Sequence, residues 1–305
     1  MKLILHRLPW KPLDLWFIGD IQWAGDPKGV AISRLNEVIA QALEAEKQGV
    51  TVRFCGMGDY IDFASPSNRQ RLKSAALYET AEGVIEQKAL ELTHDIYDIA
   101  LRPLTGKCLG LVEGHHFFDL RSGDTTDMRL CEMLKAPFLG TTGLINIQFN
   151  AELEDGKPKR TKSGRIRSRT IGATVWLHHG VGNGMTGYYP LTRLEKKSAE
   201  WEQVDVFAIG HTTKMAAEFQ NKVYPRWRTK DLAHRKVILI GTGGYSKTYV
   251  EGAMVGDKIP RGGYAERGMM NAAIIGSPVV HFRPYRVRED GSGNDIAGLR
   301  ITAEA

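Results

Sequence analysis

The stretch "LDLWFIGD", residues 13–20, is an apolar run that ends in a glycine and an aspartate. A run of this length and composition predicts a buried strand. The pattern returns in "VTVRFCGMGD" (50–59) and in "KCLGLVEGHH" (107–116), which end in Gly-Asp and in Gly-His-His. The sequence therefore predicts three strands, each of which places a polar, metal-capable side chain at its carboxyl end.

The segments between these strands predict helices. Residues 31–49, "AISRLNEVIAQALEAEKQG", have helical periodicity and end on Gly49, a residue favoured at helix C-termini. A longer helical region covers about 67–101. Strands that alternate with helices in this order predict a parallel sheet with right-handed crossovers, so the fold class is α/β.

The second half of the chain is richer in strands. Residues 143–180 alternate between apolar and polar side chains, turn, and alternate again, which predicts a long hairpin with a basic tip. "DVFAIGHTT" (205–213) predicts a strand that ends in Gly-His. Shorter strands follow, among them 236–245 and 277–287. "GTGGY" (241–245) predicts a turn whose backbone approaches the polar side chains at the strand ends.

The composition is that of a globular protein. The 305 residues are 42% hydrophobic, and no linker divides them, so we expect a single domain over 1–305, with a basic β-hairpin insertion at about 150–172. No apolar run reaches the length of a membrane span, and the N-terminal apolar segment is too short for a signal peptide. We therefore expect a cytoplasmic protein. The three cysteines share no CxxC spacing and are expected to be buried thiols.

Five apolar runs end in a side chain that can bind a metal ion. These side chains are Asp20, Asp59, His115 or His116, His178 or His179, and His211. Ligands gather at the carboxyl ends of strands in open α/β sheets, so neighbouring strands would bring these residues together. Aspartates and imidazoles suit Mn, Fe, Zn or Ni, and a cation would relieve the repulsion between clustered carboxylates.

The five endings resemble the signature of the calcineurin-like metallophosphoesterase superfamily. That signature reads Asp-x-His, Gly-Asp-x-x-Asp, Gly-Asn-His, a histidine after a strand, and Gly-His-x-His. This chain has, in the same order, "DIQ" (20–22), "GDYID" (58–62), "GHH" (114–116), "HHG" (178–180) and "GHTT" (210–213). The resemblance implies a four-layer α/β/β/α sandwich of two mixed sheets, a two-metal centre, and hydrolysis of phosphate esters by metal-bound hydroxide. Residues 247–270 and the basic loop resemble phosphoesterases of phages and bacteria.

The resemblance also implies a role for each matching residue. Asp59 would bridge two metal ions, and Asp20 would hold the first. The second would be held by His115, His211 and one of His178 and His179, with His179 favoured because Gly180 follows it. His116 falls where the family keeps a histidine near the leaving group, and Asp62 falls where the family orients that histidine.

Two departures from the signature affect the same metal ion. Gln22 and Thr213 stand where the family has histidines, whereas His115 replaces an asparagine. We therefore expect an asymmetric centre. One site would combine Asp59 with three imidazoles, and the other would be an oxygen-rich site suited to Mg or Mn. One or two divalent ions (Mn, Mg, Zn, Fe or Ni) would bind.

The basic charge of the chain permits a polyanionic partner. The net charge is +6, and residues 156–169 carry lysines and arginines without an acid. Such a tip is either a solvated loop or a contact to phosphates. Tyr224 and Trp227 either stack unpaired bases or take part in cross-strand pairs, and we favour the cross-strand pairs. The candidate substrate-binding residues are Lys159, Arg160, Arg165, Arg167, Arg226 and Arg228.

These expectations lead to three functional hypotheses. The first is a phosphodiesterase or nuclease that acts on DNA, RNA or a nucleotide. The second is a phosphomonoesterase, a cyclic-nucleotide phosphodiesterase or a phosphoprotein phosphatase. The third is a degenerate, non-catalytic nucleic-acid-binding protein, because two histidine ligands are missing.

Overall fold

The computed structural model describes most of the chain. The described residues are 1–63, 79–150, 153–154, 157–158, 170–182, 188–250, 254–255, 259–260, 266, 269, 271–288 and 295–305.

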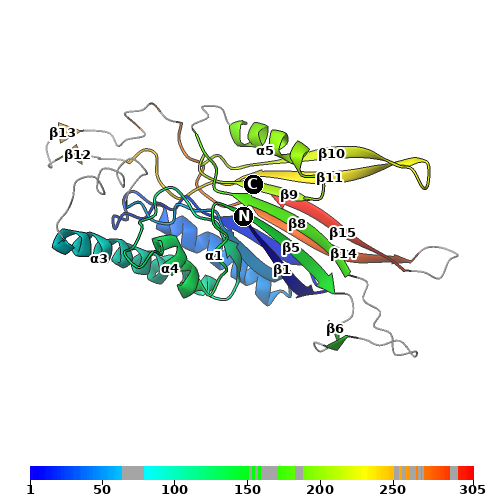
Figure 1. The fold of residues 1–305 in the computed structure, drawn as a ribbon, viewed down its shortest axis with the longest axis horizontal. Coiled ribbons are helices and arrows are strands. Elements are labelled where there is room, and N and C mark those ends of the chain that lie inside the picture. The colour runs from blue at the N-terminus through cyan, green and yellow to red at the C-terminus, as the bar shows by residue number, and fades with distance from the viewer. Residues whose placement is uncertain are drawn as a thin grey trace.

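Two mixed sheets form the centre of the fold (Figure 1). Sheet A contains six strands, in the spatial order β1 (Lys2–Pro9), β5 (Thr142–Asn150), β8 (Thr170–His178), β9 (Val206–Ile209), β11 (Asp231–Gly241) and β10 (Ala216–Arg226). Sheet B contains five, in the order β15 (Asp295–Glu304), β14 (Val279–Arg288), β2 (Leu13–Ile18), β3 (Thr51–Gly56) and β4 (Cys108–Leu111). Two short hairpins pair β6 (Leu153–Glu154) with β7 (Lys157–Pro158) and β12 (Met254–Val255) with β13 (Ile259–Pro260).

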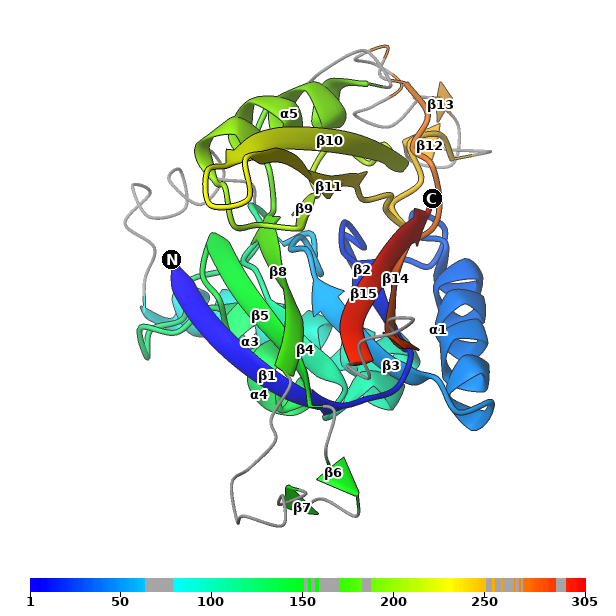
Figure 2. The same cartoon turned by 90° about the vertical axis from the view of Figure 1, so that its right-hand side faces the viewer.

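Helices cover the outer face of each sheet (Figure 2). Sheet B is covered by α1 (Ile32–Lys47), α3 (Glu79–Ile96) and α4 (Thr126–Leu134), and sheet A by α5 (Tyr189–Glu200). A π-helical turn, η1 (Tyr97–Leu101), and a 3-10 turn, η2 (Arg102–Leu104), join α3 to β4. None of the helices in the described part of the chain is long and apolar enough to cross a membrane.

Alternating side chains of the strands build three apolar layers. In β2, Leu15 and Phe17 point between the two sheets, whereas Trp16 and Ile18 pack against the helices. The layer between the sheets contains side chains from both, including fully buried Phe149 and Phe282. The expected four-layer sandwich of two mixed sheets flanked by helices is therefore confirmed.

The register of the parallel strands aligns the residues that follow them. Ile18 of β2 pairs with Gly56 of β3, and His178 of β8 pairs with Ile209 of β9. The backbone N–H of Asp20 donates to the carbonyl of Gly58 at 2.9 Å. The ends of five strands from two sheets thus lie at one edge of the molecule.

Most strands match their predicted positions, and the differences occur at edges. The helix predicted at 31–49 and the hairpin predicted within 143–180 are present as α1 and as β5 with β8. The sequence analysis missed β1, an edge strand that pairs in parallel with β5 and leaves Leu3 exposed. The favoured cross-strand pairing is confirmed for Tyr224, which lies opposite Ala233, and was wrong for Trp227, which lies in the turn after β10.

Candidate metal centre

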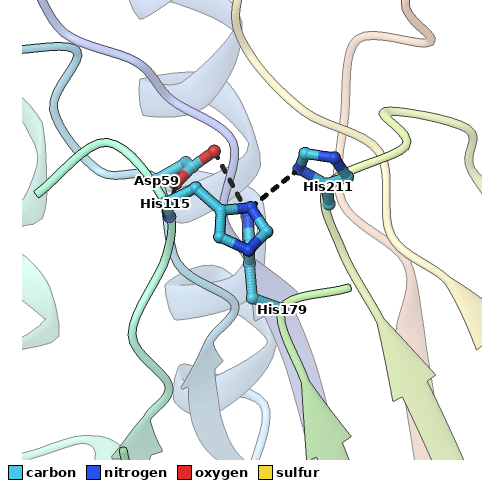
Figure 3. A group of neighbouring side chains, drawn as sticks. All are labelled: Asp59, His115, His179 and His211. Carbon is cyan, nitrogen blue, oxygen red and sulfur yellow. Dashed lines mark hydrogen bonds and ion pairs between the residues drawn. The ribbon is translucent and has the colours of Figure 1, made fainter. Parts of the chain in front are cut away.

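Four side chains from four strand ends converge on one point (Figure 3). Asp59 follows β3, His115 follows β4, His179 follows β8 and His211 follows β9. One ligand atom from each lies within 4.8 Å of the other three. Three imidazoles and a carboxylate form a donor set that suits a borderline transition metal.

Hydrogen bonds orient His179 as a metal ligand. Its Nδ1 lies 2.7 Å from the carbonyl of Met57, which can only accept, so Nδ1 carries the proton and Nε2 carries the lone pair. That Nε2 lies 3.1 Å from Oδ2 of Asp59. Both atoms are buried without a hydrogen-bond partner among the described residues. Two orphaned acceptors aimed at one point are what a cation site requires.

Without a cation, Asp59 and His179 attract each other as a buried ion pair, and a metal ion at Nε2 would take the place of the imidazolium proton. Burial opposes the charge on both groups, but their mutual attraction outweighs it. The pKa of Asp59 is held well below its usual value, and that of His179 is raised to about 9. Burial lowers the pKa of His211 to about 4, so this imidazole stays neutral and keeps a lone pair for a metal ion.

The loops that carry the centre have an unusual backbone. Left-handed φ angles between 48° and 66° occur at the predicted site residues Asp20, Gln22, Asp59, His211 and Thr213. Each such conformation costs roughly 1–2 kcal/mol for a residue with a Cβ. Strained backbone of this kind concentrates at functional sites, where the surrounding structure maintains it.

Two glycines let the loops approach one another. A Cβ on Gly114 would lie 2.1 Å from the backbone nitrogen and from Oδ1 of Asp59. A Cβ on Gly58, where φ is +90°, would lie 2.6 Å from Nδ1 of His179. Only glycine fits at these positions while the carboxylate and the imidazole keep their places.

Asp20 lies beside the four grouped ligands. Its Oδ2 accepts the backbone N–H of His211 at 2.9 Å, and its Oδ1 is buried with no hydrogen bond in the described part. Burial, reinforced by the negative charge of Asp59, raises the pKa of Asp20 to about 7. A nearby cation would favour the ionised carboxylate and lower that pKa.

The two substituted positions also lie near Asp20. A Cβ on Gly244 would lie 2.8 Å from Cβ of Asp20 and 3.1 Å from Cγ2 of Thr213, so the turn at 241–245 does approach the site. The backbone N–H of Gln22 donates to the carbonyl of Asp59, and the hydroxyl of Thr213 donates to the carbonyl of Thr212. The Thr213 oxygen therefore keeps only its lone pairs for a cation.

Of the two adjacent histidines, only His179 points into the cluster. Side chains alternate along β8, so His178 lies on the face of sheet A that is covered by α5. Its Nδ1 accepts the backbone N–H of Gly180 at 2.7 Å, and its ring stacks on Trp176. His178 is therefore not part of the metal cluster.

His116 and Asp62 form a hydrogen-bonded pair next to the cluster. Nδ1 of His116 donates to Oδ1 of Asp62 at 2.7 Å, and Nε2 lies 3.9 Å from Oδ2 of Asp59. Burial lowers the pKa of His116, but the hydrogen bond to Asp62 and the charge of Asp59 outweigh it and raise the pKa above its usual value.

Each candidate substrate-binding residue either lies at the end of the strands that is far from the metal cluster or falls outside the described residues. Lys159, Arg160, Arg165 and Arg167 lie outside them, as does much of 247–270. The insertion leaves β5 at Asn150 and re-enters at Thr170, roughly 26 Å along β8 from His178 at about 3.3 Å per residue. Arg226 ends β10, where it pairs with Asp231, and Arg228 lies in the following turn.

Sequence reasoning missed one buried carboxyl beneath the site. Oδ2 of Asp127 accepts the backbone N–H of Gly114 at 3.0 Å and so supports the loop that carries His115. Burial, followed by the charges of Asp59 and Glu113, raises the pKa of Asp127 to about 7. An acid in the first turn of α4 looks like an ordinary helix-capping residue, so the sequence pattern did not single it out.

Comparison with known proteins adds little information about the function of this chain. No protein-family profile and no curated protein matches the chain. Among solved structures, NAD nucleotidase from Haemophilus influenzae is similar over 95% of this chain, with 13% sequence identity and a TM-score of 0.36. The match spans 49% of that structure, about half its length. A likeness at this level carries no argument about function.

Proposed function

We propose that this chain is a metal-dependent phosphoesterase that hydrolyses phosphodiesters. The observation that carries the proposal is the convergence of Asp59, His115, His179 and His211, with the His116–Asp62 pair next to them. This arrangement combines a buried cation site with a positioned proton donor, which are the two components that phosphate-ester hydrolysis requires.

The residues divide between a nitrogen-rich and an oxygen-rich metal site. Asp59 and the three imidazoles would hold a first ion, and Asp20 with the side-chain oxygens of Gln22 and Thr213 would hold a second more weakly. A bound divalent ion would polarise the phosphoryl oxygens and lower the pKa of a water molecule. Oδ1 of Asp59 accepts the backbone N–H groups of His115 and His116, so Oδ2 is the oxygen of Asp59 that would bind a metal ion.

His116 would protonate the leaving oxygen. Its Nδ1 is engaged by Asp62, so the proton available for transfer is on Nε2, the nitrogen that faces Asp59. The hydrogen bond to Asp62 and the charge of Asp59 raise the pKa of His116 and so favour the protonated imidazole. Proton transfer from a positioned group typically contributes about 10²- to 10⁴-fold in rate.

Hydrolysis assays test the proposal directly. We expect bis(p-nitrophenyl) phosphate to be hydrolysed faster than p-nitrophenyl phosphate in the presence of Mn²⁺, Mg²⁺, Zn²⁺ or Ni²⁺. A preference for the monoester would support a phosphomonoesterase instead. The absence of hydrolysis with all four ions, in protein that has bound metal, would disprove the proposal.

The residue types at positions 22 and 213 favour a second candidate, a nucleic-acid-binding protein without catalysis. Gln22 and Thr213 provide neutral oxygens at positions where imidazoles would bind a transition metal more strongly, so the second site has weak ligands. Binding of DNA or RNA in a gel-shift assay with EDTA, without turnover under any metal condition, would support this candidate.

A further inference from the structure

A cleft of about 780 Å³ opens beside the metal cluster, on the α5 side of the same strand ends. Gly180 and Ile209 line it, and they lie next to His179 and two residues before His211 in the chain. The cleft and the cluster are thus separated only by the ends of β8 and β9. Its volume falls within the range of roughly 300–1,000 Å³ that is common for small-molecule sites.

The walls of the cleft contain flat groups arranged in two stacks. The rings of Trp176 and His178 are 5.6 Å apart and inclined by only 17°. The guanidinium of Arg193 lies over the ring of Tyr189 at 4.8 Å. All four side chains line the cleft, together with Trp201. Guanidinium and aromatic planes are the surfaces on which proteins stack nucleobases.

His178 contributes a fixed hydrogen-bond donor. Its Nδ1 accepts the N–H of Gly180, so in the neutral ring the proton is on Nε2. An N–H donor beside a stacking surface matches the carbonyl oxygens and ring nitrogens at the edge of a nucleobase.

The charged groups of the cleft favour an anionic ligand. Arg193, Lys196 and Lys197 line it, against the single acid Glu200, which pairs with Lys197 at 2.7 Å. Arg193 and Lys196 form no ion pair with the other described residues, whereas Lys197 does. A planar group attached to a phosphate fits both the stacking surfaces and the excess of positive charge.

We propose that this cleft binds the nucleoside part of a phosphate-ester substrate. The inference rests on the proposed function and narrows its substrate to nucleoside phosphates, either free nucleotides or the ends of a nucleic acid. The phosphate would lie at the cluster and the base in the cleft, joined by the sugar across Gly180. A Cβ on Gly180 would lie 2.8 Å from the carbonyl oxygen of Gly210, so the loops after β8 and β9 are in close contact there and the sugar would have to pass over their outer surface.

Calorimetric titration with thymidine 5′-monophosphate in EDTA tests the cleft without requiring catalysis. We expect the natural chain to bind, and Arg193→Ala to weaken binding about tenfold, within the range of about 5- to 150-fold for the loss of one stacking partner. Arg193→Lys keeps the positive charge but removes the planar guanidinium, so we expect it to weaken nucleotide binding about as much as Arg193→Ala does. Arg34→Ala, on α1 in the opposite helical layer, is the matched control and should bind like the natural chain.

The outcomes separate this inference from the proposed function. Equal binding of inorganic phosphate, or an Arg193→Ala variant that binds the nucleotide normally, would overturn the cleft assignment even if the protein hydrolyses phosphodiesters. Nucleotide binding that depends on Arg193 would support the cleft even if no hydrolysis is found. An oligothymidylate that binds more tightly than the mononucleotide, with the same dependence on Arg193, would identify a nucleic-acid end as the source of the nucleoside.

Discussion

Replacing Gly114 by alanine tests whether the contact between two loops builds the metal centre. The new Cβ would lie 2.1 Å from N and from Oδ1 of Asp59, whereas real Cβ atoms essentially never come within 3.0 Å of such atoms. Asp59 or the 114–116 loop must therefore move by about 1 Å. Disturbing the groups that position metal ligands typically costs about 10- to 100-fold in metal affinity, and overpacking a dense interior costs about 1–3 kcal/mol.

We therefore expect Gly114→Ala to bind Zn²⁺ or Mn²⁺ about 100-fold more weakly. The free energy of unfolding in EDTA should also fall by about 1–3 kcal/mol. Isothermal titration measures the affinity, and urea denaturation measures the stability. Gly29→Ala is the matched control, because the nearest atom to its Cβ, the carbonyl oxygen of Asp26, is 3.9 Å away. Normal metal affinity in Gly114→Ala would refute the reasoning.

Three further predictions concern the residues around the cluster. His116→Ala should lower kcat about 10²- to 10⁴-fold with unchanged metal content by elemental analysis, and loss of metal would instead identify His116 as a ligand. Asp62→Asn should cost about 10- to 100-fold and move the alkaline limb of the pH–rate profile to lower pH, because it removes the hydrogen bond that raises the pKa of His116. Because the pKa of His116 is higher in the folded than in the unfolded state, its protonation stabilises the fold fully below pH 6.5, and this stabilisation is lost as pH rises through the folded-state pKa. Asp62→Asn should therefore weaken the pH dependence of the melting temperature, which thermal unfolding measures. The natural chain should retain at most one tightly held metal ion after dialysis. The double variant Gln22→His with Thr213→His should retain two metal ions. Turnover that appears only in the double variant would mean that the natural chain is not an enzyme.

The loops of the metal centre have strained backbone, and densely packed strands support them. Five residues of the site have left-handed backbone, and Gly58 and Gly114 bring the loops into contact. The strands below them pack fully buried side chains, such as Phe17 and Met57, between the two sheets. Because the packed sheets resist collapse, they can hold Oδ2 of Asp59 and Nε2 of His179 in positions where neither atom has a hydrogen-bond partner among the described residues.

Some features of this protein follow from the sequence alone because they are local. The apolar runs that end in Gly-Asp or Gly-His predict both the strands and the polar residues at their ends, since strand length and turn chemistry depend on adjacent residues. The α/β order followed from the same pattern. The same pattern singles out Asp20, Asp59, His115 and His211, and in the structure they do lie at one edge of the sandwich.

Other features depend on contacts between distant segments, and only the tertiary structure decided them. The choice between His178 and His179 depends on which face of β8 meets the other sheet, and a shift of one residue would exchange them. Asp127 supports the site from an ordinary helix start, and the nucleoside cleft combines β8, β9 and α5. Such juxtapositions arise from the packing of whole layers, which no short stretch of sequence encodes.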